Sequence, residues 1–281
     1  MKKIRSITAA ILGLLLFANI IVLQMGCQTN QPKTEDELTD SVHVDLLIGV
    51  VPTLDALPLY YAQEKGICDS LGIHVKIITY ASQFDADTAL FNSAVDVMMM
   101  DRARYSDYLK KGKQLSAHLS ICGKYALVAS NQINVEQVKQ LKNRTIAIER
   151  HSAAERFCLE TINRNGLKSE EVHYPQINDL WLRTAMLNNS QVEAAVLPEP
   201  QATMAQLQGH KILVASTAPQ EVAMQLVHLK ETSKTEEIQL LIDAYQSSKQ
   251  HIEANGLSTC RNILIHNYQL SEALADSLIA Q

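Results

Sequence analysis

Short apolar runs alternate with longer stretches of helical apolar spacing along the chain from about residue 43 onward. Buried strands and amphipathic helices produce these two patterns, and their alternation is typical of a parallel sheet covered by helices. We therefore expect an α/β fold. In the first part of the chain, the pattern predicts strands at 44–51, 73–79, 95–100 and 114–121 and helices at 57–65, 82–92 and 102–111.

A second set of elements follows the first with the same order. It comprises predicted strands at 145–148, 171–174 and 192–197 and predicted helices at 152–165 and 178–189. The segments "ALFNSAVDVMMMD" (89–101) and "AMLNNSQVEAAVLPE" (185–199) are alike in organisation. Each contains the end of a helix, an Asn/Ser turn, a valine with a carboxylate, an apolar strand and a final carboxylate. This doubling indicates two similar α/β lobes.

The last part of the chain predicts a return to the first lobe. A strand is expected at 222–229, and the sequence from Glu231 is helical in pattern with an interruption at Gly256. We expect residues 43–122 and 222–281 to form one lobe and residues 123–221 to form the other. Because the chain crosses twice between the lobes, this organisation predicts a hinge and a cleft.

The N-terminus has the three parts of a secretory signal. A basic start, Met1 to Arg5, precedes an apolar run from Ile7 to Leu23, and Gly26-Cys27 follows. This arrangement resembles bacterial lipoprotein signals, which implies cleavage before Cys27 and acylation of its thiol. Residues 27–42 are polar and predict a tether, so we expect a lipid-anchored protein of the cell envelope, on the periplasmic side. A retained membrane anchor and a simple secreted form are the alternatives.

Charge and cysteine content exclude several classes of function. The formal net charge of −5 becomes −8 when residues 1–26, with three cations and no acid, are removed, and no basic stripe is present. Nucleic acid is therefore not an expected partner. The other four cysteines are scattered without a CxxC pair, so we expect mostly buried free thiols and no zinc site. His118 and Cys122 would share a helix face, but their segment has strand character, which argues against a catalytic pair.

Candidate site residues follow the predicted strands. Ligands of open α/β sheets bind beyond the carboxyl ends of the strands. Glu199 stands between two prolines that stiffen its backbone, so it would meet a ligand with little loss of entropy. The segments at these ends are Pro52-Thr53-Leu54-Asp55, Met100-Asp101-Arg102, Glu149-Arg150-His151-Ser152 and Pro198-Glu199-Pro200.

Structural explanations compete with ligand binding at each of these positions. Ser152 to Glu155 has the S-x-x-E form of a capping box, which could only cap a helix or could also bind an anion. Asp101 could cap the helix that begins at Arg102, and Glu199 could be a surface carboxylate in a turn. The run Met98 to Met100 is interpreted as core packing rather than as a cofactor site.

Four segments together resemble a known family. They are residues 48–67, 89–101, 141–167 and 192–200. In this order they are similar to solute-binding proteins of ABC importers, of the nitrate/sulfonate/taurine and thiamine-precursor (NMT1/THI5-like) type. The resemblance implies the two-lobed type II periplasmic-binding-protein fold, with a ligand cleft between the lobes. The family's usual glycine before the strand is replaced by Ser93 and by Ser190. The ligand contacts that it implies are Thr53, Leu54, Asp55, Asp101, His151, Ser152 and Glu199.

The resemblance predicts a function as well. We expect a monomeric, lipid-anchored protein that delivers a small polar or anionic solute to an ABC permease and ATPase complex, without a cofactor or metal. An enzyme of the same fold, related to pyrimidine or menaquinone routes, is one alternative. A sensor or adhesion lipoprotein is another. The enzymes of this fold are cytosolic, whereas the predicted signal and Cys27 favour the cell envelope.

Overall fold

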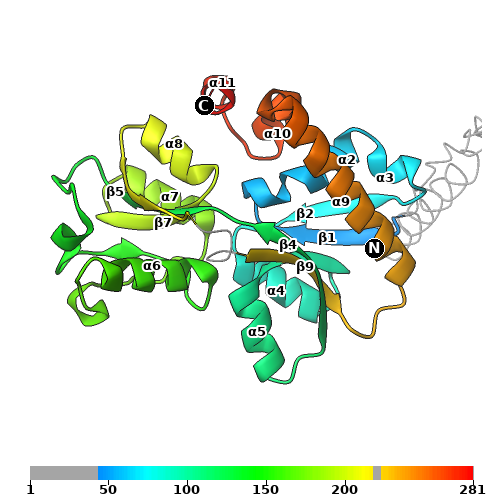
Figure 1. Ribbon diagram of the computed structural model, residues 1–281, viewed down its shortest axis with the longest axis horizontal. Coiled ribbons are helices and arrows are strands. Elements are labelled where there is room, and N and C mark those ends of the chain that lie inside the picture. Colours follow the sequence, from blue (N-terminus) through cyan, green and yellow to red (C-terminus); the bar gives the residue numbers. More distant parts are fainter. Residues whose placement is uncertain (1–43, 218–222, 281) are drawn as a thin grey trace, which may run out of the picture. The chain divides into compact units, whose positions relative to one another are not determined.

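The computed structural model describes residues 44–217 and 223–280 (Figure 1). Within these ranges the strands form two separate sheets, each covered by helices on both faces. We call the first sheet with its helices the first lobe and the second sheet with its helices the second lobe. The α/β prediction is confirmed. The boundaries 43–122, 123–221 and 222–281 remain predictions.

The first sheet has the strand order β2-β1-β3-β9-β4. β1 runs parallel to β2 and β3, whereas β9 is antiparallel to both β3 and β4. The strands are β1 (Leu46–Val50), β2 (Val75–Thr79), β3 (Val97–Asp101), β4 (Leu115–Cys122) and β9 (Ala223–Leu229). The main helices of this lobe are α2 (Leu57–Glu64), α4 (Gln83–Phe91), α5 (Arg102–Lys110) and α9 (Thr235–Asn255).

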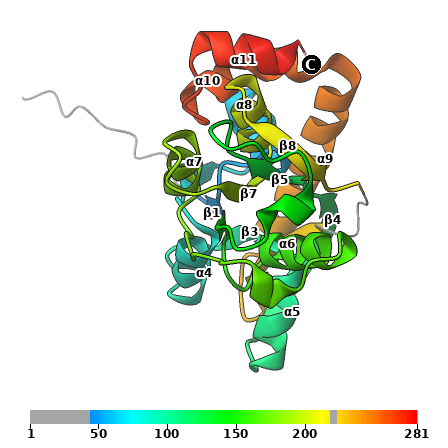
Figure 2. The same ribbon diagram turned by 90° about the vertical axis from the view of Figure 1, so that its left-hand side faces the viewer.

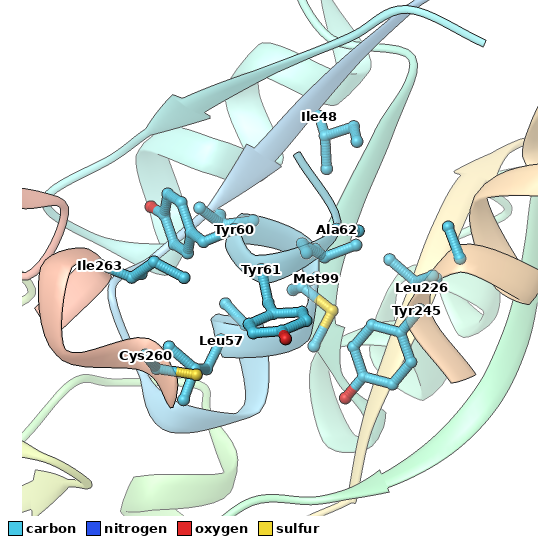
Figure 3. Packing of buried hydrophobic residues seen from close by; sticks show 14 of the residues in the cluster. Ile48, Leu57, Tyr60, Tyr61, Ala62, Met99, Leu226, Tyr245, Cys260 and Ile263 are labelled. Atoms are coloured by element: carbon cyan, nitrogen blue, oxygen red, sulfur yellow. The ribbon is translucent and has the colours of Figure 1, made fainter. Parts of the chain in front are cut away.

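The side chains of β3 alternate between the two faces of the first sheet. Val97 and Met99 pack with α2 and α9, while Met98 and Met100 pack with α4 and α5. Because both faces are covered, β3 is apolar throughout rather than alternating. Figure 3 shows Met99 among the residues of the first face, including Tyr61 and Tyr245. The interpretation of the three methionines as packing residues is confirmed.

Three short helices complete the first lobe. α3 (Ile67–Ser70) follows α2, and α10 (Arg261–His266) and α11 (Glu272–Ile279) follow α9. α9 ends before Gly256, whose positive φ of 79° is a conformation that glycine adopts readily. This matches the predicted interruption of the C-terminal helical region.

The second sheet has the order β6-β7-β5-β8. α6 covers one face, and α7 and α8 cover the other, as Figure 2 shows. Its strands are β5 (Tyr125–Ala129), β6 (Ile146–Ala147), β7 (Ala194–Pro198) and β8 (Lys211–Ala215). Its helices are α6 (Ala153–Arg164), α7 (Leu180–Asn188) and α8 (Gln201–Leu207).

The internal repeat predicted from the sequence has a counterpart in backbone geometry and hydrogen bonding. Ser93 and Ser190 both adopt a positive φ of 55°, the conformation that glycine favours at this turn. Gln83 Nε2 donates to Met99 O at 2.7 Å in the first lobe, and Arg183 Nε donates to Val196 O at 3.0 Å in the second. In each lobe, therefore, a side chain from an early turn of a helix binds the neighbouring strand.

Two expectations about strands were wrong, and two strands were missed. The sheets are mixed rather than parallel, because β9 in the first sheet and β5 in the second are antiparallel to their neighbours. β5 and β8 were not predicted. The expected strand at 171–174 is instead a 3-10 helix, Ser169–Glu171, followed by an isolated bridge between Thr145 and His173. A second isolated bridge joins Ile148 and Gln176, so this segment lies beside β6 but pairs with it only at separate points.

The described cysteines, Cys68, Cys122, Cys158 and Cys260, are unpaired, and all but Cys122 are buried. The segment of His118 and Cys122 is the predicted strand, β4. His118 Nε2 lies 3.0 Å from His228 Nε2 on β9. No helix among the described residues has the length and apolar character needed to cross a bilayer. The predicted signal, Cys27 and the predicted tether lie outside the described residues.

Candidate functional site between the lobes

The two lobes meet where the parallel strands of both sheets end. Leu54 N, just after β1, donates to Glu199 O, just after β7, at 2.9 Å. Leu180 N, at the start of α7, donates to Ala81 O at 2.9 Å. Gln201 Nε2 donates to Pro52 O at 3.0 Å. These bonds place the carboxyl ends of strands from both sheets against one another, where α/β proteins bind ligands.

A small cavity lies at this junction. Its free volume is about 20 Å³, which is room for about one water molecule. Both lobes contribute polar side chains, among them Thr53 and Gln83 from the first and Glu149 and Arg183 from the second. The complete lining is Val51, Thr53, Ser82, Gln83, Met99, Tyr125, Glu149, Asn178, Leu180, Arg183, Pro198 and Met224. A solute larger than water can enter only if the contacts between the lobes separate.

Arg183 is held rigidly at the cavity. Only 2% of the residue is exposed. Its Nε donates to Val196 O, and its Nη1 donates to Ile177 O at 2.6 Å. Burial lowers the pKa of Arg183, and the nearby Glu149 opposes that change. The guanidinium is therefore a fixed positive group in the wall of the cavity.

Glu149 follows β6 and is the buried carboxylate of the cavity. It is 7% exposed, and its Oε1 accepts no hydrogen bond from the described residues. Arg104 Nη1 lies 3.8 Å from that oxygen. Burial raises the pKa of Glu149 to about 7, although Arg183 and Arg104 favour its ionised form. The carboxyl group thus exchanges its proton near neutral pH.

Arg104 on α5 links the first lobe to the loop before α6. Its Nε and Nη2 both donate to Asp87 on α4, and its Nη1 donates to the backbone oxygens of Arg150 and His151. Tyr108 OH donates to the same Asp87 oxygen, Oδ2, at 2.8 Å. The guanidinium is therefore engaged by carbonyls and Asp87, which leaves Glu149 without a direct hydrogen bond from it.

Two predicted site residues, Asp101 and Ser152, are helix caps. Asp101 Oδ1 accepts from Arg104 N at 2.9 Å, and Ser152 Oγ accepts from Glu155 N at 3.2 Å. Burial raises the pKa of Asp101 to about 6, while the backbone NH of Ala153 at the start of α6 is among the groups that favour its ionised form. The structure thus brings Asp101 to the start of the helix that Ser152 caps. The predicted capping box is altered, because Glu155 Oε2 accepts from His151 N.

His151 lies away from the cavity. Its side chain is exposed, and its backbone has a positive φ of 56°. Together with Ser152 it lines a shallow surface pocket between α5 and α6. Of the predicted contacts, Thr53 is the one that lines the cavity between the lobes.

The remaining predicted residues, Leu54, Asp55 and Glu199, line a separate pocket of about 430 Å³ that also includes Lys124 and Tyr245. Burial raises the pKa of Asp55 to about 6, and its Oδ2 accepts no hydrogen bond from the described residues. Glu199 Oε2 accepts from Thr203 N at 3.1 Å, in the first turn of α8. The prolines around Glu199 therefore hold a carboxylate that caps a helix and lines this pocket.

Sequence reasoning missed Gln83, Arg104 and Arg183 and did not select Glu149. Glu149 was recognisable, because it directly follows a predicted strand. The other three lie within helices, where polar residues are ordinarily exposed. Their contribution depends on burial between elements that are far apart in the sequence, and no local pattern signals this.

Comparison with known proteins agrees with the architecture. Among solved structures, one similar protein is the ligand-binding component of an ABC-type import system from Staphylococcus aureus with zinc bound. Its TM-score is 0.70 at 15% sequence identity, and the match covers 84% of this chain and 83% of that chain. The alkanesulfonate-binding protein SsuA from Xanthomonas axonopodis pv. citri, bound to MOPS, has a TM-score of 0.69 at 14% sequence identity, with the same coverage of the two chains.

A Candida albicans protein described as having the generic periplasmic binding protein structural fold gives a TM-score of 0.63 at 15% identity, with 83% and 79% coverage. These likenesses confirm the two-lobed periplasmic-binding-protein fold. Curated protein sequences gave no match. The family model described as NMT1/THI5 like matches residues 53–251. That range includes both sheets except the first strand, and the chain therefore belongs to the NMT1/THI5-like family.

Proposed function

We propose that this protein is the solute-binding component of an ABC importer and that its solute binds between the two lobes. The observation that carries the proposal is the enclosed cavity at the strand ends, with polar side chains from both lobes in its wall. Once the lobes separate enough to admit it, a solute there would contact groups of both lobes at once and so link their positions. Coupling of this kind suits a protein that presents a captured solute to a permease.

Among the predicted contacts, Thr53 would touch the solute directly. Asp101 and Ser152 would support the site by fixing α5 and α6, and Leu54, Asp55 and Glu199 would form the neighbouring pocket. His151 would lie outside the cavity. Nitrate, bicarbonate, sulfonates, taurine and thiamine precursors are the candidate solutes that family membership and structural likeness suggest.

Two buried thiols are poorly suited to act as catalytic nucleophiles. Burial raises the pKa of Cys68 to about 11 and that of Cys158 to about 12. Both thiols therefore stay protonated at neutral pH, and a protonated thiol is a poor nucleophile.

We also propose that Cys27 is acylated and anchors the protein to the bacterial cell envelope. The basic start, apolar run and Gly26-Cys27 sequence support this step. Replacing Cys27 with serine should release the protein from membranes or leave an uncleaved precursor. Fractionation and gel mobility identical to those of the unchanged protein would contradict acylation.

The solute-binding function is tested with one fluorescent label on each lobe. Exposed positions in α3 and α7, such as Ser70 and Leu182, accept cysteines outside the cavity, in a background in which exposed Cys122 is replaced by serine. Addition of the true solute should change energy transfer between the labels with a saturable dependence on concentration. If no candidate solute binds with Kd below about 1 mM or alters the transfer, the proposed function is wrong.

A further inference from the structure

The buried acids around Glu149 outnumber the buried bases. Five of them are buried together: Asp87, Asp101 and Glu149 are acids, and Arg104 and Arg183 are bases. When all five are ionised, the group carries one excess negative charge. A buried excess charge is costly, so the cluster is stabilised either by a proton or by an added cation.

Glu149 is where that cation would bind. Its Oε1 is buried, accepts no described hydrogen bond and belongs to a residue that lines the cavity. Arg104 directs its donors to Asp87 and to backbone oxygens, and Arg183 donates from Nε and Nη1 to backbone oxygens. Neither guanidinium donates a hydrogen bond to Glu149. The carboxylate therefore offers an acceptor that the protein itself leaves unused.

We propose that the solute carries a positively charged hydrogen-bond donor of the ammonium class and that Glu149 Oε1 accepts from it in the cavity between the lobes. The inference rests on the proposed function and names the chemistry of its solute. An anion without such a donor would meet the excess negative charge at close range. The fixed guanidinium of Arg183 can attract an acidic end of the same molecule, so an amino acid-like zwitterion satisfies both charged walls.

The same arrangement predicts proton release on binding. The charged groups that act on Glu149 are Asp87 on α4, Asp101 on β3, Arg104 on α5 and Arg183 on α7. The charge of Glu149 in turn helps to raise the pKa of Tyr125 on β5. With a pKa of about 7, Glu149 is partly protonated at neutral pH. A bound ammonium group favours the carboxylate, so binding expels the proton. Affinity should consequently rise as the pH increases from about 6 to about 8.

The experiment uses matched compounds that differ in the amine. Taurine is compared with ethanesulfonate, β-alanine with propionate, and ethanolamine with ethylene glycol, each by isothermal titration calorimetry on the mature protein. At least one amine should bind at least about tenfold more tightly than its matched compound, which corresponds to one charged hydrogen bond. Its titration in buffers of different ionisation enthalpy should show proton release at pH 7.

Two variants separate the role of Glu149 from a general effect of charge. Glu149→Gln should lower the affinity for the bound amine at least about tenfold and abolish proton release. Glu236→Gln, an exposed change of the same charge in the first turn of α9, should do neither. Because the matched compounds and the proton measurement need only the unchanged protein, they decide the inference even if Glu149→Gln fails to fold.

Tighter binding of the amine-free compounds, or amine binding without proton release, would overturn the inference while leaving the solute-binding function intact. If neither the amines nor their matched compounds bind, the inference is overturned. If, in addition, none of the candidate solutes changes the energy transfer between the labels on the two lobes, the proposed function is overturned as well.

Discussion

Arg104 Nη1, on α5 of the first lobe, donates a hydrogen bond of 3.2 Å to the backbone oxygen of His151, which precedes α6 of the second lobe. The same guanidinium forms an ion pair with Asp87, and both side chains are nearly fully buried. One side chain thus neutralises a buried acid and joins the lobes. The junction between the lobes therefore depends on a charged group rather than on apolar packing alone.

Replacement of Arg104 by methionine should destabilise the protein strongly. Asp87 would keep the hydrogen bond from Tyr108 but would lose its cation, and breaking a buried ion pair costs about 3–5 kcal/mol. Urea denaturation measures this loss in the free energy of unfolding. The double variant Arg104→Met/Asp87→Asn should recover a large part of the loss. A single variant that loses less than about 1 kcal/mol would show that the pair contributes little.

Asp55 should make stability depend on pH in the acidic range. Its pKa in the folded protein is raised from 3.8 to about 6, so the folded state binds the proton more tightly than the unfolded state does. The stabilisation is therefore fully present below about pH 4 and is lost as the pH rises towards 6. Asp55→Asn should be more stable than the unchanged protein at pH 7, by about 1–3 kcal/mol, and should lose less stability between pH 4 and 7.

Denaturation at a series of pH values tests this prediction. Asp69→Asn is the matched control, because it makes the same change of charge at an exposed position on α3. Equal pH profiles for the Asp55 variant and the Asp69 variant would show that burial does not perturb Asp55.

The sequence predicted the parts of the fold that depend on local pattern. α4, α5, α6 and α7 begin after the side-chain caps Ser82, Asp101, Ser152 and Asp179, and the strands β1, β3 and β7 are apolar because helices cover both faces. β5 could not be placed in this way. It pairs antiparallel with β7, which lies more than 60 residues away, and that pairing depends on long-range contacts.

The site was predictable to a smaller extent for the same reason. The rule about strand ends selected Thr53, which lines the cavity, and Asp101, which supports it. The rule could not distinguish the cavity from the neighbouring pocket, since both lie near the same strand ends. Nor could it select Arg183, whose buried guanidinium reaches the cavity from within a helix.

Two substitutions at Asp101 distinguish a cap from a ligand contact. Asparagine caps helices about as well as aspartate does and carries no buried charge, so Asp101→Asn should be at least as stable as the unchanged protein, whereas Asp101→Ala should be about 0.5–2 kcal/mol less stable than Asp101→Asn. Thermal or urea unfolding at pH 7 gives the comparison. A direct contact with the solute would instead appear as an affinity loss of about tenfold in Asp101→Asn. Equal stability of the two variants would contradict the capping role.

Substitution of Glu199 tests whether the solute binds in the small cavity or in the larger neighbouring pocket. It lines the pocket of about 430 Å³ and accepts from Thr203 N, whereas Glu149 lines the small cavity between the lobes. If the solute binds between the lobes, Glu199→Gln should change its affinity less than about threefold, because the altered group does not touch it. Glu149→Gln should change the same affinity at least about tenfold.

The opposite result would place the solute in the larger pocket. In that case Glu199→Gln should lower affinity at least about tenfold, and Asp55→Asn should act in the same direction, since both carboxylates line that pocket. Titration of the two glutamine variants with the same compound makes the comparison, and their melting temperatures serve as the control for folding. Both spaces are lined by residues of both lobes, and the small cavity is favoured because its polar side chains, Thr53, Gln83, Glu149 and Arg183, are all buried.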